Sequence, residues 1–323
     1  MQACESLCVK AIYSRSLASA TAVSQSLSNV DAYADDAGDG RSLSDLLARS
    51  DVQAVIIALP IPAQPGYIKQ ALAAGKHVLA EKPIAKDLAT ARELIEYYKS
   101  NIDTSKVFFG VAENYRYMGR FRYGAEKVQQ LGKLLGFRLR MNAMVQPGGK
   151  YYETAWRKTP EYQGGFLLDG GVHFIAGTRL LLGSKARMTK LSAFTAQLQP
   201  HLPPIDTANA TIKLANGSSG TLAISFGTTF TGAEWIVACE KGTVEVQRGK
   251  VIVVEDGKES TKEFPDDGNG VKQEIKAWAD SIASGRSESL QSPEEALADL
   301  EIVSRQALCF TDVRLTVRSS RLW

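Results

Sequence analysis

The sequence has few cysteines, few histidines and no long apolar run. The longest purely apolar stretch, residues 54–59, is far too short to span a bilayer, and residues 1–9 lack a basic segment followed by an apolar one. Four cysteines in 323 residues, two close together and two remote, form neither a disulfide framework nor a paired metal site. These absences argue against a protein that is stabilised by disulfide bonds or that spans a membrane. We therefore expect a soluble protein of the reducing cytoplasm.

The chain also lacks a strong excess of charge of either sign. Its 38 basic and 35 acidic residues give a net charge of +3, with no polybasic arm and no acidic tail. We therefore expect neither nucleic acid nor a membrane surface as a partner. The apolar fraction of 44% is that of an ordinary globular protein, and the length favours two domains.

Strand and helix patterns alternate over residues 1–118. Residues 54–59 are apolar on both faces, which is typical of a strand inside a covered parallel sheet. Prolines break the chain after it, Gly75 ends the next helix, and Asp87 caps another. The pattern predicts a doubly wound α/β domain. Its expected strands are residues 8–13, 54–59, 77–80 and 107–112, and its expected helices are residues 17–27, 42–48, 68–74 and a segment after Asp87.

From residue 119 to 323 the pattern changes to an α+β domain with a mostly antiparallel open sheet. A helix over 123–130 precedes alternating segments separated by turns such as Asn216-Gly217 and Asp256-Gly257. Two helices close the chain: one begins near Val271 and is stopped by Gly285, and the other begins with a capping box at residues 292–295. The expected strands are residues 137–145, 208–214, 221–226, 235–239, 243–247 and 251–254.

One chemical motif is the string Ala80-Glu81-Lys82-Pro83. A lysine directly after a buried strand lies at the carboxyl edge of a parallel sheet, where open α/β sheets bind ligands. Held there, its ammonium group can hydrogen-bond a substrate oxygen and stabilise charge that develops on it. The alternative is a solvated lysine that ends a strand.

A second motif is the string GGFLLDGGVH at residues 164–173. If this segment is helical, Asp169 and His173 lie one turn apart on one face, and an imidazole exchanges protons near neutral pH. The glycines that precede His173 would let the chain approach a bound cofactor closely. The alternatives are a structural Asp/His pair or half of a metal site, but no further ligand arrangement indicates a metal, so we predict none.

The segment AVIIALPIPAQPGYIKQALAAGKHVLAEKP (residues 54–83), the string GGFLLDGGVHF and the two closing helices resemble the glucose-fructose oxidoreductase / inositol dehydrogenase / MocA (Gfo/Idh/MocA) family. The resemblance spans nearly the whole chain. It implies a Rossmann domain followed by an open sheet domain, and NAD(P)-dependent hydride transfer to or from a sugar, polyol, dihydrodiol or related small alcohol or carbonyl compound. It also suggests a cis bond before Pro83.

We therefore predict three catalytic residues: His173 as the leading general acid/base, Lys82 as its electrostatic partner, and Asp169 as the group that orients substrate or lysine. The predicted cofactor-binding residues come from both domains: Ser14, Arg15, Leu59, Pro60, Gln64, Glu81, Lys82, Asn114, Trp156 and Arg157. Asn114 and the pair Trp156-Arg157 match family positions near the cofactor and substrate mouth. Where relatives show Pro-Asn-x-x-His, this chain has Pro60-Ile61-Pro62-Ala63-Gln64.

The residues after the first expected strand, Ser14-Arg15-Ser16, bear on the choice of cofactor. NAD enzymes usually place a carboxylate there, whereas an arginine with flanking hydroxyls suits a 2′-phosphate. NADP(H) is therefore the preferred prediction over NAD(H). The alternative is an arginine that merely begins an exposed helix.

A glycine-rich phosphate loop after a first strand is not evident. The only Gly-x-Gly, Gly38-Asp39-Gly40, follows no expected strand, and roughly thirty residues, about one βα unit, look absent. We expect either a shortened version of a complete enzyme or weakened cofactor binding. This leaves two alternatives to the enzyme: a non-catalytic dinucleotide-binding regulatory or scaffolding protein, and an inactive shortened form.

Partners are expected to be small molecules. Tyr151, Tyr152, Trp156 and Arg157 would suit a polyhydroxylated ring, as they would other small carbonyl compounds. The sheet face around residues 221–226 is a candidate surface for homo-oligomer formation.

Overall fold

The computed structural model describes residues 4–149, 151–160, 162, 165–308 and 313–314. Gly164, the first glycine of the second motif, lies outside them.

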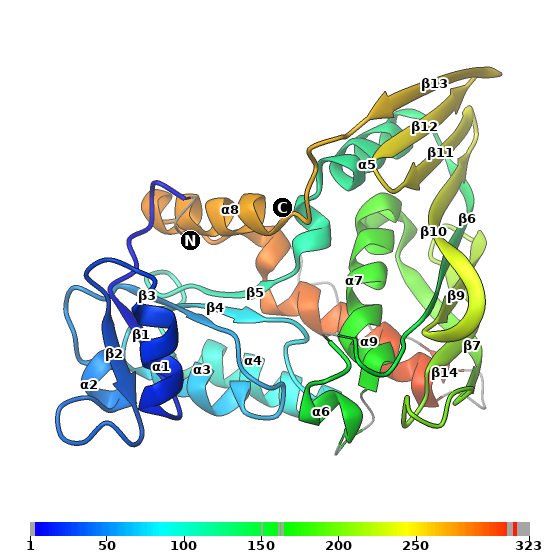
Figure 1. Ribbon diagram of the computed structural model, residues 1–323. Helices are drawn as coiled ribbons and strands as arrows, with labels where there is room; N and C mark the ends of the chain where they lie inside the picture. The colour runs from blue at the N-terminus through cyan, green and yellow to red at the C-terminus, as the bar shows by residue number, and fades with distance from the viewer. Residues whose placement is uncertain (1–3, 150, 161, 163–164, 309–312, 315–323) are drawn as a thin grey trace.

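The first part of the chain alternates strand and helix, as predicted, and all its strand pairs are parallel (Figure 1). Most elements begin or end within four residues of their predicted bounds. The elements are β1 (Ala11–Ser14), α1 (Leu17–Ser24), β2 (Asp31–Ala34), α2 (Leu43–Leu47), β3 (Ala54–Ile57), α3 (Gln64–Ala73), β4 (His77–Glu81), α4 (Leu88–Asn101) and β5 (Phe109–Ala112).

These strands form two sheets, β1-β2 and β3-β4-β5, rather than one. In the usual doubly wound order 3-2-1-4-5-6, one further strand lies between strands that correspond to β1 and β3. The described residues supply no strand at that place, so β3 is an edge strand here. This explains why the prediction of a strand buried on both faces was wrong: only Ile57 of β3 is buried, and Ala54–Ile57 is otherwise half-buried.

Pro65 was expected to break the chain before a helix at residue 68, but α3 already begins at Gln64. Pro65 occupies the first turn of α3, where its missing N–H costs no helical hydrogen bond. The predicted cap at Asp87 is confirmed, since its side chain accepts a hydrogen bond from the Thr90 amide. Helix α4 therefore begins where the sequence indicated.

The second part is an α+β arrangement built on a nine-stranded sheet of order β13-β12-β11-β10-β6-β9-β8-β7-β14. Every ladder is antiparallel except β6-β9, so the prediction of a mostly antiparallel open sheet is confirmed. The strands are β6 (Leu134–Met144), β7 (Met188–Ala196), β8 (Thr207–Leu214), β9 (Ser219–Ser225), β10 (Gly227–Cys239), β11 (Gly242–Gln247), β12 (Lys250–Glu255), β13 (Lys258–Glu263) and β14 (Val313–Arg314). The sequence patterns did not indicate β7, β13 or β14.

Helices connect and flank this sheet. They are η1 (Asn114–Tyr117), α5 (Gly119–Gln130), α6 (Ala155–Lys158), α7 (Gly165–Leu182), η2 (Ser184–Ala186), α8 (Val271–Ser284), η3 (Ser289–Gln291) and α9 (Pro293–Leu308). Helix α9 contacts β5 and α4 of the first part as well as α7, and Trp278 of α8 packs on Leu79 and Ala112 (Figure 1). The division at residues 118 and 119 remains a prediction.

Helix α7 is the central buried element of the second part. It is long and apolar enough to cross a membrane by composition alone, the only such helix among the described residues, but 78% of it is buried inside the protein. A Cβ atom added at Gly177 would lie 2.7 Å from the Phe121 ring, and one at Gly170 would lie 2.6 Å from the Phe226 ring. These glycines let bulky neighbours pack against the helix, which is the behaviour of a core helix.

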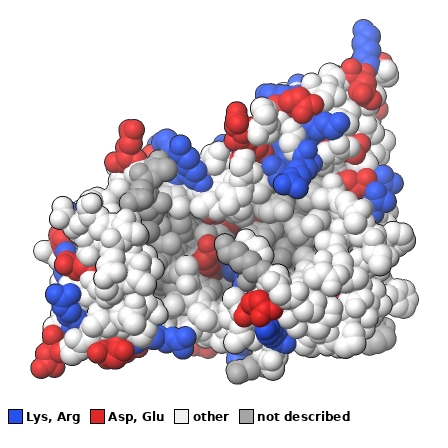
Figure 2. Space-filling view, viewed as in Figure 1, with Lys and Arg blue, Asp and Glu red and all other residues white. Residues whose placement is uncertain are grey.

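Both signs of charge are interspersed over the face seen in Figure 2, without an extended patch of one sign. This distribution agrees with the small net charge of the chain.

Candidate active site

The two motifs singled out in the sequence meet in the structure. Lys82 follows the last residue of β4, and its Nζ atom donates to Asp169 Oδ1 at 2.9 Å and to the Asp169 carbonyl at 2.8 Å. The lysine side chain is 15% exposed and the aspartate side chain 12%. The bond between Lys82 and Pro83 is cis. Residues that are 87 positions apart therefore form one ion pair between β4 and α7.

Asp169 is also bound by a second cation. Arg157, from α6, donates through Nε to Asp169 Oδ2 at 2.8 Å, and its guanidinium group lies 4.0 Å from the centroid of the Trp156 ring. Burial alone would raise the pKa of Asp169, but Lys82 and Arg157 outweigh burial and hold the pKa below its usual value. Asp169 is therefore an anion that holds two cations in fixed positions.

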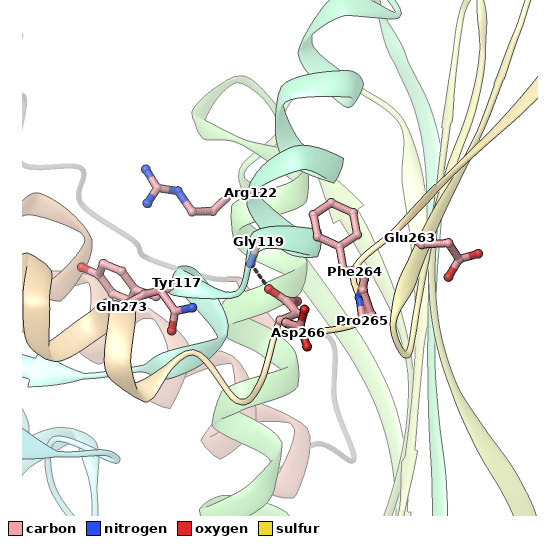
Figure 3. Close-up of a pocket in the computed structure, with 9 residues that line it drawn as sticks. Tyr117, Gly119, Arg122, Glu263, Phe264, Pro265, Asp266 and Gln273 are labelled. Carbon is pink, nitrogen blue, oxygen red and sulfur yellow. Dashed lines mark hydrogen bonds between the residues drawn. The ribbon is translucent and has the colours of Figure 1, made fainter. Parts of the chain in front are cut away.

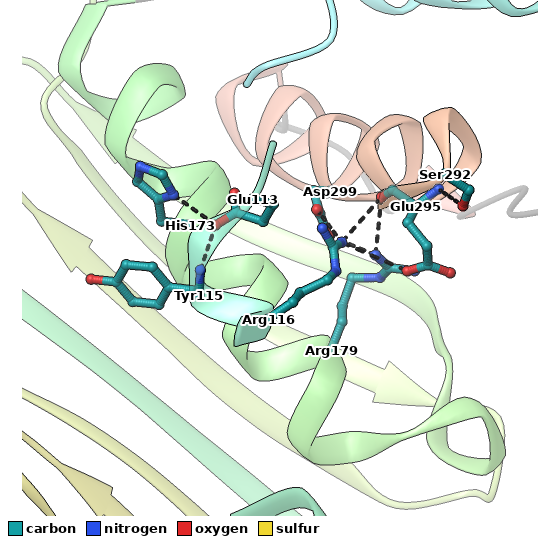
Figure 4. Close-up of polar contacts among 8 residues, drawn as sticks. All are labelled: Glu113, Tyr115, Arg116, His173, Arg179, Ser292, Glu295 and Asp299. Atoms are coloured by element: carbon teal, nitrogen blue, oxygen red, sulfur yellow. Dashed lines mark hydrogen bonds and ion pairs between the residues drawn. The ribbon is translucent and has the colours of Figure 1, made fainter. Parts of the chain in front are cut away.

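His173 lies one helical turn after Asp169 but pairs with a different carboxylate. Its Nδ1 atom is 2.7 Å from Glu113 Oε1, and Glu113 is only 2% exposed (Figure 4). Sequence reasoning missed Glu113. The signal was present, because Glu113 directly follows β5 and so stands at the same carboxyl edge of the sheet as Lys82.

A cavity of about 310 Å³ lies beside this cluster and brings several predicted cofactor residues together. Trp156, which lines the cavity, lies 4.0 Å from the Arg157 guanidinium group that pairs with Asp169, so the cavity adjoins the Lys82–Asp169 pair. The lining residues are Arg15, Leu59, Pro60, Pro62, Ala63, Tyr67, Trp156, Thr159 and Tyr162. Of these, Tyr67, Thr159 and Tyr162 had no role in the sequence analysis.

Two polar groups near this cavity fit a bound dinucleotide. Arg15 makes no hydrogen bond or ion pair within the described residues, and its side chain lines the cavity. Gln64 is 1% exposed, and its Oε1 atom has no hydrogen-bond partner. Because buried polar atoms are nearly always paired, Gln64 is a group that a ligand could satisfy. The residues present therefore fit a nicotinamide dinucleotide.

The end of β1 carries mixed charges. Beside Ser14 and Arg15, the carboxylate of Asp36 accepts a hydrogen bond from the Leu17 amide at the start of α1, at 2.6 Å. Tyr13 donates to the neighbouring Asp35. The sequence did not indicate that Asp35 and Asp36, in the loop after β2, lie close to the end of β1 that carries Arg15.

Some predicted residues lie apart from the cavity. The Asn114 side-chain amide donates to the Asn269 carbonyl, and Asn114 does not line the cavity. Among the glycines before His173, Gly165 adopts φ +66° and a Cβ atom there would lie 2.4 Å from the Pro203 carbonyl oxygen. Gly165 and Gly170 therefore allow close packing within the protein, and a close approach of these glycines to a cofactor stays a prediction.

A second hollow, of about 440 Å³, lies between the start of α5 and the chain that leads from β13 to α8 (Figure 3). The Gly119 amide donates to Asp267 at its wall. This hollow shares no lining residue with the first cavity, and it contains none of the predicted catalytic groups.

Glu274 of α8 is a buried acid behind the site. It is 3% exposed, and burial, together with repulsion from Glu113 and Glu81, raises its pKa to about 9. Glu81 retains access to solvent, but desolvation by its surroundings likewise raises its pKa. Three carboxyl groups thus lie close together at this end of the sheet, and Glu274 is protonated at neutral pH.

We expect Glu274→Gln to stabilise the protein at neutral and alkaline pH. Because the folded pKa of Glu274 is raised above that of the unfolded chain, native Glu274 must take up a proton on folding, and stability falls as pH rises from about 4.5 towards 9. Glutamine removes this cost, which is on the order of a few kcal/mol at pH 8. Thermal unfolding at pH 5 and pH 8 measures the gain, which should be small at pH 5. The exposed Glu126→Gln is the control, and an equal gain at both pH values would contradict the assignment.

Comparison with known proteins supports the reading of the motifs. Residues 1–109 match a protein-family model described as oxidoreductase family, NAD-binding Rossmann fold, and residues 126–307 match one described as oxidoreductase family, C-terminal alpha/beta domain. Both bear the name of the Gfo/Idh/MocA proteins. The chain belongs to the Gfo/Idh/MocA oxidoreductase family. The resemblance stated from the sequence is thereby confirmed.

Individual family members match over most of the chain. It is 42% identical over 304 residues to dehydrogenase FPY6 of Fusarium mangiferae, which covers 91% of this chain and 86% of that protein. A crystal structure of an oxidoreductase from Thermotoga maritima superposes with a TM-score of 0.80 at 27% identity, covering 91% of this chain and 86% of the other. Levoglucosan dehydrogenase in complex with NADH and levoglucosan superposes with a TM-score of 0.80 at 18% identity, covering 96% and 90%. The last similarity concerns the fold alone.

Proposed function

We propose that this family member is an NADP(H)-preferring dehydrogenase or reductase that transfers hydride between nicotinamide and a sugar, polyol, dihydrodiol or related small alcohol. The observation that carries the proposal is the ion pair of Lys82 with Asp169, one helical turn before His173 on α7, beside a cavity lined by Arg15 and Trp156. A dinucleotide-binding regulator would have no chemical need for a lysine held by a carboxylate next to an imidazole.

In the proposed reaction, a bound nicotinamide supplies the acceptor or donor of hydride. His173 takes the proton of the substrate hydroxyl during oxidation and returns it during reduction. Lys82 donates a hydrogen bond to the same oxygen and stabilises its developing negative charge. Asp169 holds the Lys82 ammonium group at the carboxyl edge of β4 through two hydrogen bonds. The chain thus provides both proton transfer and charge stabilisation at one oxygen.

The substrate side of the proposal comes from α6 and the segment before it. Arg157 lies over Trp156 and also 5.7 Å from the ring centroid of Tyr151. Aromatic faces with a fixed guanidinium group suit a polyhydroxylated ring. The solved levoglucosan dehydrogenase binds a sugar derivative of this kind.

A panel of sugars, inositols and dihydrodiols tests the function directly. With NADP⁺, at least one compound should produce reduced nicotinamide, detected by its absorbance. Binding of NADPH, followed by fluorescence, should occur at micromolar concentration. A purified, folded protein that binds neither NADPH nor NADH and oxidises no compound would contradict the proposal.

Arg15 is the residue proposed to favour NADP(H). Arg15→Ala should raise the Kd for NADPH about tenfold or more and leave the Kd for NADH within about twofold, because only the 2′-phosphate needs the guanidinium group. Fluorescence titration with both cofactors measures the two constants, with the exposed Arg286→Ala as control. Equal weakening for both cofactors would show that Arg15 does not discriminate between them.

We further propose a cytoplasmic location and a homo-oligomer. Cys4, Cys8 and Cys239 are free thiols, which suits a reducing compartment.

On the nine-stranded sheet, Phe194 of β7 is 80% exposed and Phe230 of β10 is 74% exposed. Apolar side chains so fully exposed on a sheet support the predicted association through this domain.

A further inference from the structure

The His173 ring is held on one side by Glu113, which directly precedes η1, and by Tyr115 of η1. Nδ1 lies 2.7 Å from Glu113 Oε1, and the same oxygen accepts the Tyr115 amide at 3.2 Å. The Tyr115 ring stacks on the imidazole, with centroids 5.2 Å apart and an interplanar angle of 18°. Nε2 makes no hydrogen bond to any residue that the structure describes. Nδ1 is therefore bound to Glu113, and Nε2 can interact with a substrate.

The protonation state of Glu113 decides which nitrogen carries the proton. Burial alone would raise the pKa of Glu113, but His173, Arg116 and Lys82 together lower it below its usual value. Glu113 is therefore an ionised carboxylate, which only accepts hydrogen bonds, so Nδ1 must donate. A neutral imidazole has one N–H, which leaves Nε2 as an acceptor.

Several charged or titratable groups surround Glu113. Lys82 and Glu81 come from the end of β4, Tyr115 and Arg116 from η1, His173 from α7 and Glu274 from α8. Since Glu274 is protonated at neutral pH, it adds no negative charge there. Arg116 and Lys82 add to the larger effect of His173 in lowering the pKa of Glu113, and Glu113 Oε1 already acts as an acceptor of the Tyr115 amide.

We propose that Glu113 is the positioning residue that keeps the proton of His173 on Nδ1, so that Nε2 receives the proton of the substrate hydroxyl. This inference deepens the proposed function and rests on it. In oxidation, the O–H and C–H bonds of the alcohol break and a carbonyl forms; the proton goes to Nε2 and the hydride to an oxidised nicotinamide dinucleotide. The resulting imidazolium is stabilised by Glu113 and then loses its proton to water.

The relative position of Glu113 and His173 is fixed through α9. Arg116, three residues after Glu113, and Arg179, six residues after His173, both donate to the Asp299 carboxylate (Figure 4). Arg179 also pairs with Glu295 at 2.8 Å, while the Glu295 amide donates to Ser292 Oγ, which is one half of the predicted capping box. Asp299 is 2% exposed. A single buried carboxylate thus joins the two segments that carry the His173–Glu113 pair, and it favours one ring orientation.

The other two histidines provide internal references, because their contacts require the opposite tautomer. His77 Nδ1 accepts the Phe108 amide at 3.1 Å, and His201 Nε2 lies 2.8 Å from the Val145 carbonyl, to which it must donate. Both rings therefore carry their proton on Nε2 when neutral. Among the three histidines of the chain, only His173 should carry it on Nδ1.

Nitrogen-15 NMR of histidine-labelled protein without ligand tests the proposal. Wild-type protein should show one ring protonated on Nδ1, absent in His173→Ala, and two rings protonated on Nε2. In Glu113→Gln, whose amide can donate to Nδ1, the Nε2-protonated form of His173 should become populated. In the control Glu301→Gln, which removes a buried carboxylate bound to Arg305, His173 should be unchanged. A wild-type His173 protonated on Nε2, or an unchanged tautomer in Glu113→Gln, would overturn the proposal.

Kinetics supply the second readout. Glu113→Gln should lower kcat by about 10²- to 10⁴-fold with KM within about threefold, because Glu113 acts through His173 and not on the substrate. Glu113→Asp keeps a carboxylate and should recover part of the loss. An inactive wild type with the predicted tautomer would contradict the proposed function alone, whereas an active enzyme with full kcat in Glu113→Gln would contradict the role of Glu113.

Discussion

Replacement of Lys82 by methionine is expected to lower kcat by about 10²- to 10⁴-fold while the protein remains folded. Methionine keeps the length and apolar stem of the side chain but removes the ammonium group that Asp169 holds at the edge of β4. The substrate oxygen would then lose its charged hydrogen-bond donor. Steady-state kinetics on any substrate found in the sugar panel measures the loss.

Lys86 provides the matched control, because it lies four residues further along the same loop and is exposed. Lys86→Met should keep wild-type kcat and KM. Cofactor binding by Lys82→Met, followed by fluorescence, separates loss of chemistry from loss of binding. Turnover in Lys82→Met within about threefold of wild type would refute the role proposed for this lysine.

Substitution of Asp169 by asparagine is expected to reduce both activity and stability. Lys82 and Arg157, each 15% exposed, would be left without their anion. Removal of the Asp169 charge leaves two largely buried cations without a partner, which lowers the free energy of unfolding by about 3 kcal/mol. kcat should fall at least about 100-fold, because the Lys82 ammonium group is no longer held in place.

The pH dependence of unfolding separates this charge effect from a packing effect. The folded pKa of Asp169 is lowered, so its stabilising contribution is present above the unfolded carboxyl pKa, about 4, and is lost as pH falls below it. The stability difference between wild type and Asp169→Asn should therefore shrink as pH falls from 5 to 2. Asp280→Asn, which breaks an exposed pair with Lys276, should have no measurable effect. A difference that stays constant with pH would exclude the electrostatic explanation.

The sequence predicted those parts of the fold that depend on local patterns. Helix α8 begins at Val271 and ends before Gly285, as the sequence indicated, since Gly285 adopts φ +66° at the helix end. The family motifs suggested that Asp169 orients either substrate or Lys82, and the structure contains the ion pair with Lys82. By contrast, β13 was missed because Lys258–Glu263 is exposed along its length and has no apolar alternation.

Long-range contacts account for what the sequence did not predict. Glu113 had no motif around it, and its role depends on a histidine 60 residues away. The position of Asp36 beside the start of α1 depends on how the loop after β2 folds back. The first part forms two sheets because the described residues supply no strand between β1 and β3.

The most direct test of the account compares wild type, Lys82→Met and Lys86→Met on the same panel of sugars, inositols and dihydrodiols with NADP⁺ and NAD⁺. We predict that wild type and Lys86→Met reduce the cofactor with at least one compound, faster with NADP⁺, and that Lys82→Met loses this reaction. The account would be contradicted if the three proteins reduced the cofactor at equal rates, or if folded wild-type protein neither bound a nicotinamide cofactor nor oxidised any compound.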